Sequence, residues 1–246
     1  MVKSTYPYKR WIRPKFLSLK YRYKYGSVPD PYGLITVDTN NINHITFPKF
    51  SQEFGTYGTH IVGGDWDQRV TEKSIFYSNS REDVLSRRHL LPLENYKLYL
   101  ALKDRFVHDK DWKDTEFYQW AIDNLEGTDS YYDITVIDDR LSFLDELFHD
   151  MRDEGYATQQ ELLTNQNISF KSYFRIPERQ EVMISIGRDG RMAVDEGRHR
   201  FMIAKILGLE IPVRVLARHE QWYKKRELVK SGEVDYSNHP DLRNLA

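Results

Sequence analysis

The chain has 246 residues, 40% apolar and 14% aromatic, enough to build the core of one large domain or two small ones. It contains no cysteine, which excludes disulfide bonds, thiolate metal sites and a cysteine nucleophile. There is no apolar run of about eighteen residues and no apolar leader near the N-terminus. We therefore expect a folded, soluble, cytoplasmic protein without a transmembrane segment, whose chemistry uses oxygen and nitrogen groups.

The net charge of −1 hides an uneven distribution along the chain. Residues 1–25 hold eight lysines and arginines and no acid, which leaves 28 basic against 37 acidic residues in the rest. Aromatic residues such as Trp11 and Tyr23 alternate with these charges. We expect residues 1–25 to form a basic aromatic arm that lies on nucleic acid, on an anionic membrane or on the acidic body of the protein itself.

Residues 26–33, GSVPDPYG, are rich in turn formers and mark the first expected boundary. Residues 34–37 and 42–47 then have the composition and alternation of short strands. A glycine-rich stretch over residues 54–67, FGTYGTHIVGGDWD, predicts a loop whose backbone can approach a ligand closely. It matches no phosphate-loop pattern.

From Leu93 onward, apolar residues recur with the period of a helix. We expect three helices, whose apolar residues fall within 96–106, 117–125 and 141–151. Their expected caps are, in chain order, Asp111 or Asp114, Gly127, Asp138 or Asp139, and Gly155. Residues 26–165 are thus predicted to be a mixed region that is mainly helical after residue 93.

The C-terminal part, residues 166–246, has the clearest pattern. Apolar side chains alternate from Val182 to Ile186, a tight turn is expected at residues 188–191, and a return strand at 192–195. This pattern predicts a β-hairpin.

A helix is then expected from Gly197 to Leu207, closed by Gly208, with a strand through Ile211 and Val215 after it. This succession predicts a β-α-β unit, and a last helix follows in EQWYKKRELV. The expected fold class is α+β, a small mixed sheet in the C-terminal third packed with an N-terminal helical region. The two parts form either separate units or one continuous domain.

The strand and helix of that unit meet at Asp195-Glu196-Gly197-Arg198-His199-Arg200, here called the corner. A helix N-terminus offers unpaired N–H groups and the positive end of the helix dipole to an anion. Gly197 permits a close approach, and Arg198 and Arg200 are suited to contact phosphate oxygens. The corner therefore predicts a phosphate-binding site.

The acids and the histidine of the corner supply candidate catalytic groups. Asp195 and Glu196 are suited to orient an acceptor or to coordinate magnesium, and His199 is suited to proton transfer. The alternative for the whole corner is an exposed turn with local salt bridges. For His199 alone, the alternative is a histidine that packs in the core.

Two further places carry candidate carboxylates. Asp65 and Asp67 flank Trp66 beside two glycines and can share one metal ion, or they belong to a structural turn. Glu181, at the start of the hairpin, is a candidate base, although a charge at a strand edge is its more ordinary role. If the glycine-rich loop folds over the corner, Asp65 and Asp67 complete a magnesium–phosphate site there.

The run from Glu181 to about Trp222, EVMISIGRDGRMAVDEGRHRFMIAKILGLEIPVRVLARHEQW, resembles the ParB/sulfiredoxin superfamily. The shared features are a strand, a Gly-x-x-Arg corner, a helix ending in Leu-Gly and a strand opening with Ile-Pro-Val. The resemblance covers less than a fifth of the chain. The resemblance implies nucleotide phosphates at the corner, as in ParB-like nucleotide hydrolases. In the free-serine kinases of the superfamily an Asp-Gly-His-His-Arg corner serves phosphoryl transfer, and here Glu196 and Arg198 replace its Asp and first His. The absence of cysteine excludes sulfiredoxin chemistry.

The leading expectation is a magnesium-dependent phosphotransferase or nucleotide hydrolase that binds ATP or CTP at the corner. A nucleic-acid-binding ParB-like protein or nuclease, which uses residues 1–25 on a phosphodiester backbone, is the alternative. A scaffold without catalysis is the third possibility.

Overall fold

The computed structural model describes residues 13–26, 30–70, 88–125, 134–165, 177–234 and 238–243. Within these residues, seven strands form one mixed sheet in the order β1-β7-β5-β6-β2-β4, with β3 paired to β7 beside β1. The strands are β1 (Leu34–Asp38), β2 (His44–Phe47), β3 (His60–Val62), β4 (His89–Pro92), β5 (Met183–Ile186), β6 (Met192–Glu196) and β7 (Glu210–His219). The α+β class expected from the sequence is confirmed.

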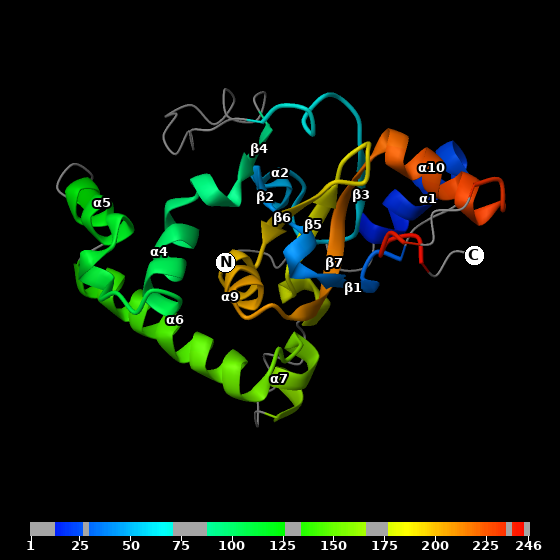
Figure 1. The fold of residues 1–246 in the computed structure, drawn as a ribbon. Coiled ribbons are helices and arrows are strands. Elements are labelled where there is room, and N and C mark those ends of the chain that lie inside the picture. Colours follow the sequence, from blue (N-terminus) through cyan, green and yellow to red (C-terminus); the bar gives the residue numbers. More distant parts are fainter. Residues whose placement is uncertain are drawn as a thin grey trace, which may run out of the picture.

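The helices of the described residues cover both faces and one end of this sheet (Figure 1). They are α1 (Arg13–Tyr25), α2 (Phe50–Phe54), α4 (Lys97–Phe106), α5 (Glu116–Leu125), α6 (Ile134–Glu154), α7 (Gln159–Asn165), α9 (Arg198–Ile206) and α10 (Glu220–Lys230). Short 3-10 turns lie at Thr39–Asn41, Leu93–Asn95, Trp112–Asp114 and Pro177–Gln180. None of these helices is long and apolar enough to cross a membrane.

The alternation in β5 separates two hydrophobic clusters. Val182, Ile184 and Ile186 point to the larger cluster, which the sheet shares with α4, α6 and α9. Met183 points to a smaller cluster on the other face, where Phe50 of α2 packs. Every residue of β5 is buried, because its neighbours β6 and β7 lie on both edges and helices cover both faces.

The end of the expected basic arm is a helix that lies on the protein itself. Tyr21 of α1 is 5% exposed, and its hydroxyl accepts a hydrogen bond from Ile61 N–H of β3 at 3.1 Å. One turn further, the ring of Tyr25 lies 5.2 Å from that of Tyr223 in α10. These contacts place α1 beside α10 (Figure 1), while residues 1–12 of the arm lie outside the described residues.

The strands on both sides of the expected boundary at residue 165 pair in one sheet. β2 joins β6 in parallel, and β1 joins β7 in antiparallel orientation. The mixed region and the C-terminal part therefore share a single core, which is the continuous arrangement left open by the sequence.

The expected β-α-β unit has a different connection from the one predicted. The hairpin of β5 and β6 is present, and α9 links β6 to β7, but β5 lies between those two strands. Since β5 is antiparallel to β6 and parallel to β7, the parallel pair is β5 and β7. The hairpin and α9 together form the crossover between them.

Several element boundaries differ from the prediction because local capping groups compete. Asp111 caps the 3-10 turn, accepting from Lys113 N–H at 3.0 Å, whereas Thr115 Oγ1 accepts from Tyr118 N–H at the start of α5. Helix α6 begins at Ile134, before the expected caps, and Gly155 ends it with the expected positive φ of 83°. The expected cap at Gly127 lies outside the described residues.

Candidate functional site

The corner lies where β6 ends and α9 begins, and a glycine is required there by packing. Gly197 has φ 71° and ψ 28°, the left-handed conformation that a residue with a side chain rarely adopts. A Cβ on Gly197 would lie 2.9 Å from Val182 Cα and 3.1 Å from Val182 Cγ2. A side chain at position 197 therefore has no room beside the chain just before β5, and the close approach of a phosphate to this backbone stays a prediction.

Asp195 is fully buried and holds the N-terminus of α2. Its Oδ2 accepts a hydrogen bond from Phe50 N–H at 2.5 Å, and its Oδ1 accepts one from Ser51 N–H at 3.0 Å. Burial raises the pKa of Asp195, while these N–H groups and the charge of Arg198 favour the carboxylate. Both oxygens are thus occupied by a helix cap, so the expected role in orienting an acceptor stays a prediction.

Glu181 has the same kind of environment on another helix. It is 2% exposed, and it accepts hydrogen bonds from Gln159 N–H, the first residue of α7, and from the Tyr156 hydroxyl at 2.9 Å. Arg200 Nη1 lies 3.3 Å from the same carboxylate. Glu181 therefore links α7 to α9, and its expected role as a base stays a prediction.

Both arginines of the corner bind the protein itself. Arg198 is 8% exposed, and it donates from Nη2 to the Thr46 carbonyl at 2.6 Å and from Nε to the Asp195 carbonyl at 3.3 Å. Arg200 pairs with Glu181 and donates to the carbonyl of Ala157. The two guanidinium groups selected as phosphate ligands are largely committed to these contacts, so that role also stays a prediction.

Glu196 lies on the open side of the corner. Its Oε2 is 2.8 Å from Lys49 Nζ and its Oε1 accepts from Ser51 Oγ at 2.6 Å, with about 30% of its side chain exposed. Burial alone would raise its pKa, but the bonds from Lys49 and Ser51 hold the pKa of Glu196 below its ordinary value. Glu196 is therefore an ionised carboxylate that reaches solvent.

His199 lies on the same side, next to a cation from a different helix. Arg140 of α6 is exposed and donates from Nη2 to His199 Nε2 at 3.1 Å. Burial, together with the charges of Arg140, Lys49 and Arg198, lowers the pKa of His199 to about 4. The imidazole is neutral near pH 7, and no carboxylate among the described residues pairs with Arg140.

Sequence reasoning missed Lys49, Ser51 and Arg140, since none belongs to a motif. Ser51 lies in α2 and Lys49 precedes it. Both reach the corner because Asp195 caps the N-terminus of this helix. Arg140 follows from the position of α6 alone. We refer to Lys49, Ser51, Arg140, Glu196 and His199 together as the open cluster.

Asp65 and Asp67 do not join this cluster. Both bind Arg188 in the hairpin turn, at 2.7 Å from Asp65 and 2.9 Å from Asp67. Burial would raise the pKa of Asp67, but hydrogen bonds from Arg188 hold it below its ordinary value. Val182, just before β5, lies against Gly197 of the corner, whereas Asp67 and Arg188 meet in the turn after the other end of β5.

The expected composite magnesium–phosphate site is therefore not formed. Among the described residues, no group of three or more histidines or acids has the arrangement of a metal site. With Arg188 bound between them, Asp65 and Asp67 have the contacts of a structural turn, which was the alternative interpretation.

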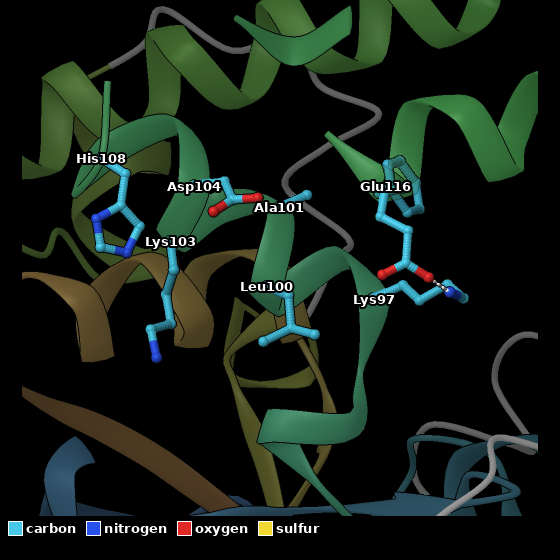
Figure 2. Close-up of a pocket in the computed structure, with 8 residues that line it drawn as sticks. Lys97, Leu100, Ala101, Lys103, Asp104, His108 and Glu116 are labelled. Atoms are coloured by element: carbon cyan, nitrogen blue, oxygen red, sulfur yellow. Dashed lines mark hydrogen bonds and ion pairs between the residues drawn. The ribbon is translucent and has the colours of Figure 1, made fainter. Parts of the chain in front are cut away.

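A pocket of about 270 Å³ lies between α4 and α5, and none of its lining residues belongs to the open cluster (Figure 2). It is lined by Lys97, Leu100, Ala101, Lys103, Asp104, His108, Glu116 and Phe117. Figure 2 shows Lys97 paired with Glu116 at one side and His108 near Lys103 at the other. Its lysines have carboxylate partners in Glu116 and Glu94, so the pocket offers no unpaired charge comparable to Arg140.

Comparisons with protein-family models, curated proteins and solved structures find no match to this chain. The resemblance of residues 181–222 to the ParB/sulfiredoxin superfamily therefore stays an expectation. The fold and the open cluster define an α+β protein with cations and one ionised carboxylate gathered at a strand-to-helix corner.

Proposed function

We propose that this protein binds the phosphates of a nucleoside triphosphate, ATP or CTP, with magnesium at the open cluster and transfers or hydrolyses the terminal phosphoryl group. The observation that carries the proposal is the convergence of Lys49, Arg140 and Arg198 on His199, a neutral imidazole at the N-terminus of α9. Cations that disfavour a proton on His199 favour an anion beside it for the same electrostatic reason.

Within the proposal, the phosphate-binding role passes from Arg198 and Arg200 to Lys49 and Arg140. Lys49 is partly exposed and Arg140 is exposed, so both reach a ligand from solvent without breaking a buried contact. The N-terminal amides and dipole of α9 add to the attraction. Lys49 would exchange part of its interaction with Glu196 for the phosphate.

The residues present fit a magnesium ion. Magnesium in phosphate sites is held by one or two carboxylates together with phosphate oxygens, and Glu196 is an ionised, partly exposed carboxylate beside the proposed phosphate position. When bound, the ion would offset the negative charge that develops on the transferred group.

His199 has the proton-transfer role. An anion bound beside it would cancel the repulsion from Lys49 and Arg140 and raise its pKa toward neutrality, where a general base is effective. His199 would then accept the proton of the attacking hydroxyl or water. The attacking oxygen would form a bond to the terminal phosphorus as the bond between that phosphorus and the bridging oxygen breaks, and the leaving nucleoside diphosphate would retain the electron pair of the broken bond.

The test is a thermal-shift titration of the full chain with magnesium and ATP or CTP. Ligand at about 100 times its dissociation constant stabilises a folded protein by ~2.7 kcal/mol, which gives a clear rise in Tm. We expect this rise in the wild type and its loss in Arg140→Met. The matched control is Arg152→Met on the same helix, because Arg152 pairs with Asp153 and not with the cluster. No rise with any nucleotide, or equal rises in Arg140→Met and the wild type, would refute the proposal.

Catalysis is tested separately by phosphate release. We expect release by the wild type above the rate of the Glu196→Gln variant, whose neutral amide no longer supplies a carboxylate. A protein that binds nucleotide with no release above that of Glu196→Gln would be the scaffold considered from the sequence.

A nucleic-acid-binding function is the second candidate, and the exposed face of α1 favours it. Phe16, Leu19 and Tyr23 are 66%, 67% and 96% exposed, and α1 has no acid in its sequence RPKFLSLKYRYKY. Exposed rings among lysines and arginines suit base stacking and phosphate contact. Binding of single-stranded DNA that weakens with salt, and weakens further in Tyr23→Ala with Lys20→Gln, would support this function. Binding unchanged by these substitutions would exclude α1 as the surface.

A further inference from the structure

A second group of cations, Arg214 and Arg179, lies near Tyr32 in the turn before β1. Arg214 is buried, and it has no carboxylate partner among the described residues. Arg214 of β7 is 0% exposed, and its Nη2 lies 3.1 Å from Met183 Sδ, a weak acceptor. Its Nε and Nη1 are buried with no hydrogen-bond partner in the part of the chain that the structure describes. A guanidinium group with two nitrogen atoms that donate no hydrogen bond to the described residues is therefore buried in the protein.

Such an arrangement is costly for the ligand-free protein. A charge removed from water loses several kcal/mol of solvation unless a partner replaces the water. Burial lowers the pKa of Arg214 to about 10, which leaves the group charged near neutral pH. The two acids that act on it electrostatically, Glu178 and Asp195, form no hydrogen bond with it, and both oxygens of Asp195 are bound to α2.

The neighbours of Arg214 extend the cationic group to the surface. Tyr32, in the turn before β1, has its ring centroid 5.6 Å from Arg214 Cζ, and its buried hydroxyl makes no hydrogen bond of standard geometry with described residues. Arg179 stacks on Tyr57 at 3.6 Å, and the acceptor of its hydrogen bonds among the described residues is Thr56 Oγ1, at 2.8 and 3.1 Å. Tyr32 and Arg179 are each partly exposed, so the group connects buried Arg214 with solvent.

The charges of this group also affect one another. Burial raises the pKa of Tyr32, and the positive charges of Arg214 and Arg179 oppose that rise. Burial lowers the pKa of Arg214, and the charge of Arg179 lowers it further. Two like charges that are held together without an intervening carboxylate define a position where an anion is stabilised by both.

We propose that Arg214, Arg179 and Tyr32 form a binding site for a phosphate group, either inorganic phosphate or the phosphate of a monoester. A phosphate oxygen accepts one of the unused Arg214 donors, Nε or Nη1, which point to different sides of the guanidinium group, while Arg179 supplies a second guanidinium and Tyr32 a hydroxyl donor.

This site is distinct from the open cluster. Arg214 lies on β7, two strands from β6, so it is ~10 Å from the strand that carries Glu196 at about 4.8 Å per strand spacing. None of Arg214, Arg179 or Tyr32 belongs to the open cluster. The proposal therefore does not depend on the nucleotide-binding function.

The experiment measures binding of inorganic phosphate to the full chain by calorimetry and by the rise in Tm, with AMP as the monoester probe. We expect wild-type protein to bind one or both, and Arg214→Met to lose the response. Since methionine replaces an unpaired buried charge with an apolar chain, ligand-free Arg214→Met should have a Tm at least equal to that of the wild type. A purely structural arginine would give the opposite result, a lower Tm.

Further variants keep the test decisive if Arg214→Met does not fold. Tyr32→Phe and Arg179→Gln should each raise the dissociation constant for phosphate at least tenfold. Arg191→Gln is the control, because Arg191 pairs with Asp189 in the hairpin turn and should leave binding unchanged. Arg140→Met should also retain phosphate binding here, which separates this site from the open cluster.

Phosphate and AMP bound equally would identify the free phosphate group as the feature recognised, and tighter binding of AMP would identify a monoester. The proposal is overturned if neither probe binds the wild type, or if binding is unchanged in Arg214→Met or, where that variant does not fold, in Tyr32→Phe and Arg179→Gln.

Discussion

Two glycines at the ends of one helix give a measurable test of why the corner needs a glycine. Gly197 begins α9 and Gly208 follows its end, with φ of 71° and 68° respectively. An alanine in this left-handed conformation costs about 1 kcal/mol at either position. The surroundings differ, because a Cβ at Gly208 meets nothing within 4 Å, whereas a Cβ at Gly197 meets Val182 Cα at 2.9 Å.

The expected losses of stability follow from that difference. Gly208→Ala should lower the free energy of unfolding by ~1 kcal/mol, the backbone cost alone. Gly197→Ala adds an overpacking cost of about 1–3 kcal/mol, because Val182 meets the new methyl group with backbone as well as side-chain atoms. Its total loss should therefore be ~2–4 kcal/mol.

The assay is equilibrium urea denaturation of both variants and the wild type, with equal m-values required for the comparison. Nucleotide-induced shifts in Tm are measured on the same three proteins. Equal losses of stability in the two variants would refute the packing explanation. If Gly197→Ala then also lost the nucleotide response while Gly208→Ala kept it, the close approach of a phosphate predicted from the sequence would be the better account.

Three more predictions concern buried charges. Asp195→Ala leaves two buried N–H groups of α2 without an acceptor and should cost ~2–6 kcal/mol in urea denaturation, at about 1–3 kcal/mol each. Arg188 depresses the pKa of Asp67, so that pair stabilises the fold above about pH 4 and loses its effect as pH falls through the folded pKa. Arg188→Met should be less stable than the wild type at pH 7, with a smaller difference at pH 3; a constant difference would contradict this. His199 has a folded pKa of about 4, so protonation of the unfolded chain should lower stability between about pH 6.5 and 4 by up to ~3 kcal/mol. His199→Gln should remove that part of the pH dependence in denaturation curves, and an unchanged profile would show that His199 is not its source.

Sequence patterns predicted those helices and strands whose formation depends on neighbouring residues in the chain. The hairpin of β5 and β6 follows from alternation around a tight turn, and α9 follows from a glycine at each end of an apolar run. By contrast, β3 has three residues and is a strand because β7 pairs with it in parallel. Helix α2 has five residues, too few to show a period, and its cap is supplied by Asp195 from 145 positions later in the chain. Such elements depend on partners that no short window contains.

The sequence indicated where the charged residues of the corner gather. It did not indicate which of them are paired inside the protein and which face solvent. Charge density at a strand-to-helix junction indicated the corner, and Glu196 and His199 do face its open side. A sequence cannot show which charges are paired, because the partners of Arg198 and Arg200 are carbonyls and an acid from other elements. For the same reason the sequence did not indicate Arg214. In the sequence it is one residue of a strand, and only the structure shows its unpaired donors.

The capping acids connect the structural and the functional parts of the corner. Asp195 accepts Ser51 N–H and so fixes the start of α2, and the side chains of Ser51 and the preceding Lys49 then contact Glu196, the next residue of β6. A buried carboxylate and an exposed one, adjacent in sequence, thus hold the backbone and the side chains of the same short segment. Asp195 is accordingly a positioning residue in the proposed function, because its loss would displace Lys49. The six-residue motif combines a rigid support with a small polar surface that Arg140 from α6 completes, and in the proposed function that surface binds the phosphates.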